Sequence, residues 1–238
     1  MLILCSPNNP TGSVYSHAQL EALVAVLREF LNIIVLSDEI YNALIYHSSI
    51  TNHLSLASFS ELSDRLIVIN GVSKAYAMTG YRVGWLLTKN KDFLAACVRL
   101  QGQQLTCATV IAQKAAEAAL TGPQDCVEQM RQVFDERRRL ICRLAADIPG
   151  FKFREPQGAF YLFPDVSSLY GKYLPSFQGG AGGRLTSSDS LAEYLLNEAH
   201  VAVVPGSAFG APNCIRLSYA ISTEEITEAM SRIKHALA

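Results

Sequence analysis

The feature that most limits the fold of this 238-residue chain is a series of short apolar runs in its first third. The runs at residues 2–5, 32–41, 65–71 and 82–88 each have the length of a buried strand. Residues 16–31 carry leucine and valine at helical spacing, and Ser16 is placed to cap that helix. Apolar runs separated by helical segments are typical of parallel strands covered by helices. The sequence therefore predicts an α/β fold with a mostly parallel sheet.

The rest of the chain has a different pattern. Residues 91–144 are largely helical, with a break at Thr121–Pro123, and Ser222 with Glu225 has the spacing of a capping box. A glycine-rich stretch at residues 178–188 is predicted to be a linker or flexible loop. The remaining predicted elements are strands at 158–166, 201–210 and 213–220 and helices at 187–199 and 222–237.

Composition excludes several classes of partner. Half of the residues are hydrophobic, 17% are charged, and the net charge is −1, so neither a nucleic-acid partner nor a membrane surface is indicated. The opening residues are too short an apolar run for a signal peptide, and no run is long enough to span a bilayer. The six cysteines have no metal-ligand spacing, which predicts reduced thiols, no metal and a cytoplasmic protein.

Lys74 is unusual because it lies among small and apolar residues. Between Ile67 and Leu87 the only charged side chains are Lys74 and Arg82. Two interpretations remain open at this point. Either the lysine reaches solvent past an apolar surface, or a pocket holds it for the chemistry of its amine.

Polar side chains follow the predicted strands at the positions where open parallel sheets place their ligand sites. Most have a simple structural explanation by themselves. Asn9 can shape a turn, Asp38 can cap a helix and Tyr41 can belong to the core. Arg82 can pair with a surface carboxylate, and Arg216 can lie on an exposed strand face. Together they predict a site, which consists of Asn9, Asp38, Tyr41, Lys74, Arg82 and Arg216.

Five motifs in this chain resemble those of the pyridoxal-phosphate aminotransferases of fold type I, in the aspartate aminotransferase branch. They are "SPNNPTG", "LSDEIY", "SKAYAMTGYRVGW", "GAFYLFPDV" and "VPGSAFG…IRLSYA", and together they cover nearly the whole chain. The resemblance implies that residues 1–124 are part of the cofactor-binding large domain. Residues 125–238 then form an interdomain helix and a smaller α+β C-terminal domain.

The resemblance also implies roles for the residues at the cofactor. Lys74 binds the aldehyde of pyridoxal 5'-phosphate through its amine, and an apolar pocket would favour the neutral amine that this reaction needs. Asp38 pairs with the pyridine nitrogen and keeps it protonated. Asn9 and Tyr41 hydrogen-bond the phenolic oxygen of the ring. Lys74, Tyr41 and Asp38 are thus the expected catalytic residues.

Two arginines match the anion-binding positions of the family. Arg82 is expected to bind the cofactor phosphate, and Arg216 the α-carboxylate of the substrate, beside Asn9. A planar guanidinium suits both anions because it can donate two parallel hydrogen bonds. The resemblance further predicts a cis peptide bond between Asn9 and Pro10.

This chain departs from the family pattern at two points. Many relatives have a serine that contacts the phosphate three residues before the lysine, and here that position is Gly71. Ser73 is adjacent to the lysine, but the resemblance assigns it no role. Relatives also carry a substantial N-terminal region before "SPNNPTG", so the large domain is expected to be N-terminally incomplete and the chain to resemble the C-terminal portion. We therefore expect the 238-residue chain alone to be weakly active or inactive.

Three functions remain open from the sequence. The first is transfer of an amino group from an amino acid, with aspartate expected, to a 2-oxo acid, with 2-oxoglutarate expected. The second is a β-lyase or another amino-acid-transforming reaction that uses the same lysine. The third is a catalytically silent fragment with a binding or assembly role. The family builds its site between two subunits, so a homodimer is expected.

Overall fold

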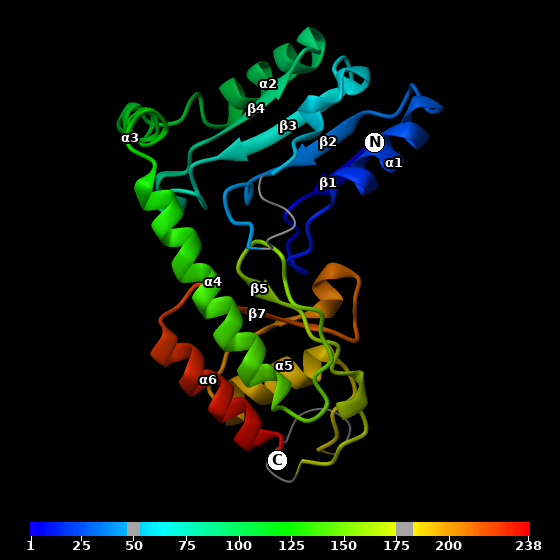
Figure 1. Ribbon diagram of the computed structural model, residues 1–238, viewed down its shortest axis with the longest axis vertical. Coiled ribbons are helices and arrows are strands. Elements are labelled where there is room, and N and C mark those ends of the chain that lie inside the picture. The colour runs from blue at the N-terminus through cyan, green and yellow to red at the C-terminus, as the bar shows by residue number, and fades with distance from the viewer. Residues whose placement is uncertain (47–52, 175–182) are drawn as a thin grey trace. The chain divides into compact units, whose positions relative to one another are not determined.

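The computed structural model describes residues 1–46, 53–174 and 183–238. The chain forms two compact units (Figure 1). Unit 1 contains Met1–Asn8 and Ser13–Arg131, and unit 2 contains Asn9–Gly12 and Gln132–Ala238. The two units divide within one helix, and each is described by itself below.

Unit 1 is built on a four-stranded sheet of order β1-β2-β3-β4. The strands are β1 (Leu2–Cys5), β2 (Val35–Asp38), β3 (Leu66–Gly71) and β4 (Gly84–Thr88). The first three are mutually parallel, which confirms the α/β fold with a mostly parallel sheet. The fourth strand differs, because β4 runs antiparallel to β3. The connection between them contains only the 3-10 turn Thr79–Tyr81 and no α-helix to return the chain along the sheet.

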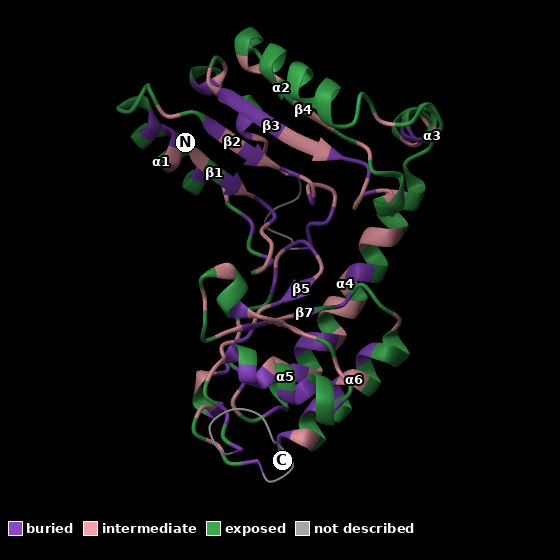
Figure 2. Ribbon diagram, turned by 180° about the vertical axis from the view of Figure 1, so that it is seen from behind, coloured by how far each residue is buried: buried purple, intermediate pink, exposed green. Residues whose placement is uncertain are grey.

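Helix α1 (His17–Arg28) covers the sheet and provides much of the core of unit 1. Ser16 caps it and forms a capping box with Gln19, which confirms the predicted start. Its buried face carries Leu20, Val24 and Leu27, which pack with strand residues of the sheet. In Figure 2 this part of the sheet is largely buried. Two 3-10 turns, Leu56–Ser58 and Ser60–Leu62, add Leu56 and Leu62 to the same core.

The predicted helical region forms three helices. They are α2 (Lys91–Gln104), α3 (Val110–Thr121) and α4 (Asp125–Ala146). The predicted break at Thr121–Pro123 is confirmed. A further break follows α2, where Thr106 has φ of +63° and Thr109 caps α3. Helix α2 has no buried residue and is mostly green in Figure 2, since only Phe93 and Cys97 are of intermediate exposure. The units divide within α4, after Arg131.

Unit 2 contains a small antiparallel sheet of order β5-β7-β6. Its strands are shorter than the predicted ones, because continuous pairing is limited to β5 (Tyr161–Leu162), β6 (Val204–Pro205) and β7 (Ile215–Ser218), and Asp165 and Cys214 form only an isolated bridge. The helices are α5 (Ser188–Glu198) and α6 (Thr223–Ala236). The 3-10 turns are Ser167–Leu169 and Gly206–Phe209.

The helix starts of unit 2 follow local capping signals. Ser222 and Glu225 form the predicted capping box at the start of α6, and Ser187 caps α5. Leu191 and Ile233 are fully buried on α5 and α6. Part of the glycine-rich stretch predicted at 178–188 lies outside the described residues.

Two further findings concern the chain as described. The Asn9–Pro10 peptide bond is cis, as predicted, and the Ser6–Pro7 bond is cis as well. Within residues 1–46, 53–174 and 183–238, no helix combines the length and the apolar character that crossing a bilayer requires.

Candidate active site

Asp38 and Lys74 belong to the same edge of the unit 1 sheet. Asp38 is the last residue of β2 and pairs in register with Ile69 of β3, and Lys74 lies in the turn that follows β3. Because β2 and β3 are parallel, their carboxyl ends meet at one edge, where α/β proteins place their ligand sites. The half-buried Asp38 accepts a hydrogen bond at Oδ1 from the Ile40 N–H, at 3.2 Å.

Lys74 is held beside a buried aromatic ring. Its Nζ lies 5.8 Å from the centroid of the Tyr41 ring, and the Tyr41 residue is only 4% exposed. Val72 and Ala75, on either side of the lysine in the chain, are buried, and Lys74 itself is half-buried. The ring and these buried neighbours limit where the amine can lie. The geometry favours the interpretation in which the lysine is held in place over the one in which it extends into solvent.

Arg82 lies at the end of the 3-10 turn that follows this lysine. Its backbone is left-handed, with φ of +56°, which is uncommon for a residue other than glycine. The exposed side chain donates from Nη1 to the carbonyl oxygen of Thr79 at 2.9 Å. This contact uses one of the five N–H donors of the guanidinium, so the group retains capacity for an anion.

The packing around Gly71 explains why a serine is absent there. Gly71 is buried at the end of β3 and pairs with Gly84 of β4. A Cβ atom at position 71 would lie 2.9 Å from both the Cα of Gly84 and the carbonyl oxygen of Val83. Two backbones approach each other too closely here for any side chain, so a serine at this position would require the strands to move apart.

Arg216 and Asn9 come together in unit 2. Nη1 of Arg216, on β7, donates to Oδ1 of Asn9 at 2.8 Å, although 207 positions separate the two residues. The guanidinium carbon of Arg216 also lies 4.5 Å from the ring centroid of Tyr161 and 5.1 Å from that of Phe209. The arginine is therefore held by one hydrogen bond and two aromatic rings.

One donor of Arg216 has no acceptor among the described residues. Its Nε is buried and makes no hydrogen bond there. A buried N–H that lacks an acceptor is costly, and an arginine presents Nε and an Nη as a fork that matches a carboxylate. The arrangement can therefore receive a carboxylate.

The structure thus places the six predicted residues in two groups. Asp38, Tyr41, Lys74 and Arg82 are in unit 1, and Asn9 and Arg216 are in unit 2. The sequence reasoning missed the two rings that hold Arg216. Both rings lie within motifs already quoted, "GAFYLFPDV" and "VPGSAFG", but no local spacing rule connects either ring to an arginine on another strand.

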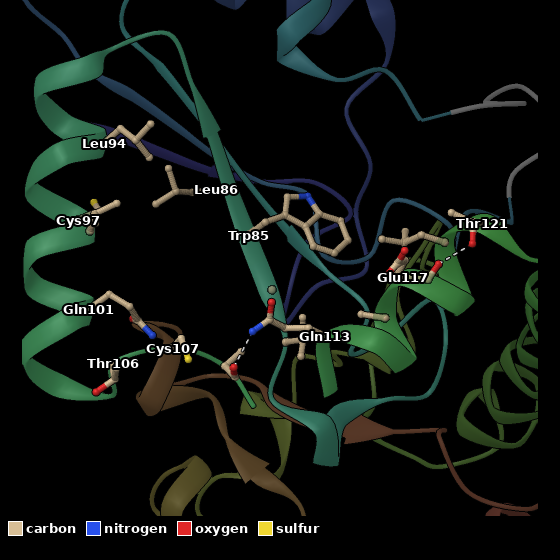
Figure 3. Close-up of a pocket in the computed structure, with 16 residues that line it drawn as sticks. Trp85, Leu86, Leu94, Cys97, Gln101, Thr106, Cys107, Gln113, Glu117 and Thr121 are labelled. Atoms are coloured by element: carbon tan, nitrogen blue, oxygen red, sulfur yellow. Dashed lines mark hydrogen bonds between the residues drawn. The ribbon is translucent and has the colours of Figure 1, made fainter. Parts of the chain in front are cut away.

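A pocket elsewhere in unit 1 contains none of these six residues. It has a volume of about 840 Å³ and lies against β4, α2 and α3 (Figure 3). Leu86 of β4 faces Leu94 and Cys97 of α2, and Gln113 and Glu117 of α3 lie at its other end. Its lining includes no lysine or arginine, so it lacks the cation that an anionic ligand needs.

Comparisons with known proteins give a consistent result. Residues 1–233 match the sequence profile described as aminotransferase class I and II. A bifunctional aspartate aminotransferase and glutamate/aspartate-prephenate aminotransferase of Petunia hybrida is 45% identical over 240 residues, which is all of this chain and 48% of that protein. An aspartate aminotransferase of Bacillus sp. strain YM-2 is 45% identical over 98% of this chain and 56% of its own length.

Solved structures show the same similarity. The aspartate aminotransferase of Rhizobium meliloti superimposes with a TM-score of 0.90 at 38% identity, over 99% of this chain and 57% of that one. The aromatic aminotransferase of Pyrococcus horikoshii does so with a TM-score of 0.87 at 37% identity, over 99% of this chain and 59% of that one. The chain thus spans about half the length of the relatives it matches.

Proposed function

The chain belongs to the aminotransferase class I and II family, and from this premise we propose that it carries out pyridoxal-phosphate-dependent transfer of an amino group from aspartate to 2-oxoglutarate. The observation that supports this most is the amine of Lys74, held over the Tyr41 ring at the sheet edge where Asp38 ends β2. The names of the aspartate aminotransferase relatives support the choice of substrates.

The side chains present fit the chemical groups of the cofactor. An aldehyde needs an amine, which Lys74 supplies, and a protonated pyridine nitrogen needs a carboxylate, which Asp38 supplies. A phosphate needs cationic donors, and the exposed guanidinium of Arg82 uses only Nη1 in its contact with Thr79. The buried phenol of Tyr41 lies close to the lysine amine and is suited to bind the phenolic oxygen. When bound, the cofactor withdraws electrons from the α-carbon of the amino acid.

Each residue then has a defined task in this proposal. Asp38 holds a proton on the ring nitrogen through the charge of its carboxylate. Lys74, once its amine is free, moves a proton to or from the α-carbon. Asn9 accepts from Arg216 at Oδ1, and its NH₂ group can donate to the phenolic oxygen of the ring.

Arg216 is assigned to the α-carboxylate of the substrate. Its buried Nε has no acceptor among the described residues, and the Tyr161 and Phe209 rings restrict the plane of its fork. A substrate carboxylate would satisfy the donor and so orient the amino group that reacts. As part of the same proposal, the protein acts as a cytoplasmic homodimer. Its described cysteines are all free thiols, which suits a reducing compartment.

The proposal is tested by mapping the lysine that reacts with the cofactor. The chain is incubated with excess pyridoxal phosphate, reduced with borohydride and digested, and the labelled peptide is identified. We expect the label on Lys74, its loss in Lys74→Ala, and no change in Lys89→Ala, a matched control at an exposed lysine. Label distributed over several lysines would count against the assignment.

A product assay distinguishes transfer from the alternatives. The protein is incubated with the cofactor, aspartate and 2-oxoglutarate. Oxaloacetate with glutamate indicates amino transfer, and ammonia with pyruvate indicates a β-lyase. Labelling of Lys74 without any turnover indicates a fragment that binds the cofactor and is silent by itself.

A further inference from the structure

A buried polar network lies directly beside the proposed cofactor aspartate and has no part in the chemistry described above. Glu39 follows Asp38 in the chain and is only 4% exposed. Its Oε1 accepts hydrogen bonds from the hydroxyls of Ser37 and Ser55, both at 2.8 Å. Its Oε2 lies 3.7 Å from Nδ1 of His53, whose side chain is 11% exposed. A carboxylate is this deeply buried only when partners satisfy its oxygens.

The contacts of Glu39 and His53 close a ring around the end of β2. The His53 Nε2 lies 3.0 Å from the carbonyl oxygen of Ser6. The Ser6 N–H in turn donates to the carbonyl oxygen of Asp38 at 3.1 Å. Glu39 is bonded covalently to Asp38 and reaches His53 through its carboxylate. Asp38, Ser6, His53 and Glu39 thus form a closed cycle that connects the ends of β1 and β2 to the segment after residue 52.

Most contacts of this cycle pair a hydrogen-bond donor with an acceptor. The carbonyl oxygen of Ser6 can only accept, so the contact requires a proton on Nε2 of His53. Oε1 of Glu39 accepts hydrogen bonds from the hydroxyls of Ser37 and Ser55. Nδ1 of His53 and Oε2 of Glu39 face each other at 3.7 Å, and both side chains are almost fully buried, so the two side chains restrict each other's position.

We propose that Glu39 and His53 are positioning residues that hold the Asp38 carboxylate at the edge of the sheet where the cofactor ring nitrogen is to bind. Glu39 directly follows β2, and its carboxylate meets the hydroxyl of Ser37 two positions earlier. In an extended chain the Asp38 side chain between them points to the opposite face, so the cycle restrains the backbone on one face and orients the carboxylate on the other. The inference rests on the proposed role of Asp38. An aspartate at the end of a strand is otherwise free to move with the fraying strand end.

Backbone hydrogen exchange of the 238-residue chain, without cofactor, tests the inference. The amide of Ile40 donates to the Asp38 carboxylate, and the amide of Ser6 donates to the Asp38 carbonyl, so both report on the position of Asp38. The amide of Val35 donates to the carbonyl oxygen of Arg65 at the other end of β2 and serves as the internal reference. We expect Glu39→Leu, which removes the acceptor at similar volume, to accelerate exchange at the two reporter amides at least tenfold. Exchange at the reference amide should change less than threefold.

Further variants separate a positioning role from a general loss of stability. Glu39→Gln keeps an acceptor for the two serine hydroxyls and should give a smaller acceleration. His53→Ala should accelerate exchange at Ser6 and decides the question if Glu39→Leu does not fold. Glu61→Gln removes an exposed carboxylate that pairs with Arg28 and should leave all three amides unchanged. Unchanged exchange at the reporter amides in Glu39→Leu and His53→Ala, or an equal acceleration at the reference amide, overturns the inference.

A second measurement separates this inference from the proposed function. The pyridoxal phosphate concentration that gives half-maximal labelling of Lys74 is compared between the native chain and Glu39→Leu. If Asp38 binds the cofactor, this concentration should rise at least fivefold in the variant. Accelerated exchange at the reporter amides with unchanged labelling would uphold the restraint on Asp38. It would reject the role of Asp38 at the cofactor.

Discussion

The steric environment of Gly71 makes a quantitative prediction about the close approach of β3 and β4. The substitution Gly71→Ala adds one methyl group, which would lie 2.9 Å from the Cα of Gly84 and from the carbonyl oxygen of Val83. Both contacts are with backbone atoms, so no flexible side chain can move aside. The two strands must separate locally, and their paired hydrogen bonds at this end of the sheet must lengthen.

Two opposing effects set the size of the change. Overpacking of a well-packed site costs about 1–3 kcal/mol. Replacing glycine by alanine in a strand recovers about 0.5–1 kcal/mol, because the unfolded chain loses conformational freedom. The packing cost is larger because the clash is with backbone, so we expect Gly71→Ala to lower the free energy of unfolding by about 1–2 kcal/mol.

Equilibrium unfolding in urea measures this effect. With a slope of about 2 kcal/mol per molar, the midpoint should fall by about 0.5–1 M. Gly80→Ala is the matched control, because nothing lies within 4 Å of a Cβ at that position and its φ is not positive. We expect the control to be neutral or slightly stabilising. A Gly71→Ala protein that is as stable as the native chain would refute the reasoning, and it would leave the absence of the relatives' serine unexplained.

Three further predictions concern single side chains. Arg216→Lys keeps the charge but loses the two parallel donors of the guanidinium. In an active enzyme we expect kcat/KM for aspartate to fall by an amount equivalent to about 1.5–3 kcal/mol of transition-state stabilisation, with cofactor affinity little changed. Lost cofactor binding would contradict the assignment. Burial raises the pKa of the Cys142 thiol to about 12. At pH 8 iodoacetamide should therefore alkylate the exposed Cys107 and spare Cys142. Equal alkylation of both cysteines in the folded protein would contradict the burial of Cys142. Hydrogen bonds from Ser167 lower the pKa of Asp165 below its ordinary value of 3.8. The ionised Asp165 therefore stabilises the folded protein fully above that pH, and this stabilisation is lost as the pH falls further. The urea midpoints of the native protein and of Asp165→Asn should converge in acid. A difference between the midpoints that stays constant with pH would refute this effect.

Some of these features could be predicted from the sequence because the forces that produce them are local. Ser16 and Ser222 cap their helices through partners only three residues away, so the start of each helix is visible in a short window of sequence. The strands β1 to β4 were located by their apolar runs for the same reason. Lys74 was singled out because the charged neighbours expected around an exposed lysine are missing from its own segment. The composition of a short segment determined each of these features.

Other features depend on segments that are distant in the sequence, and only the tertiary structure decided them. The antiparallel direction of β4 depends on how the chain returns across the sheet, and the apolar run of that strand is compatible with either direction. The contact of Arg216 with Asn9 joins residues 207 positions apart, and the cycle through Glu39 and His53 joins three separate segments. In sequence, Glu39 is an ordinary charged residue after a strand. Its burial and its partners arise only when the ends of parallel strands meet, because hydrogen bonding and packing depend on distance in space and not on separation along the chain.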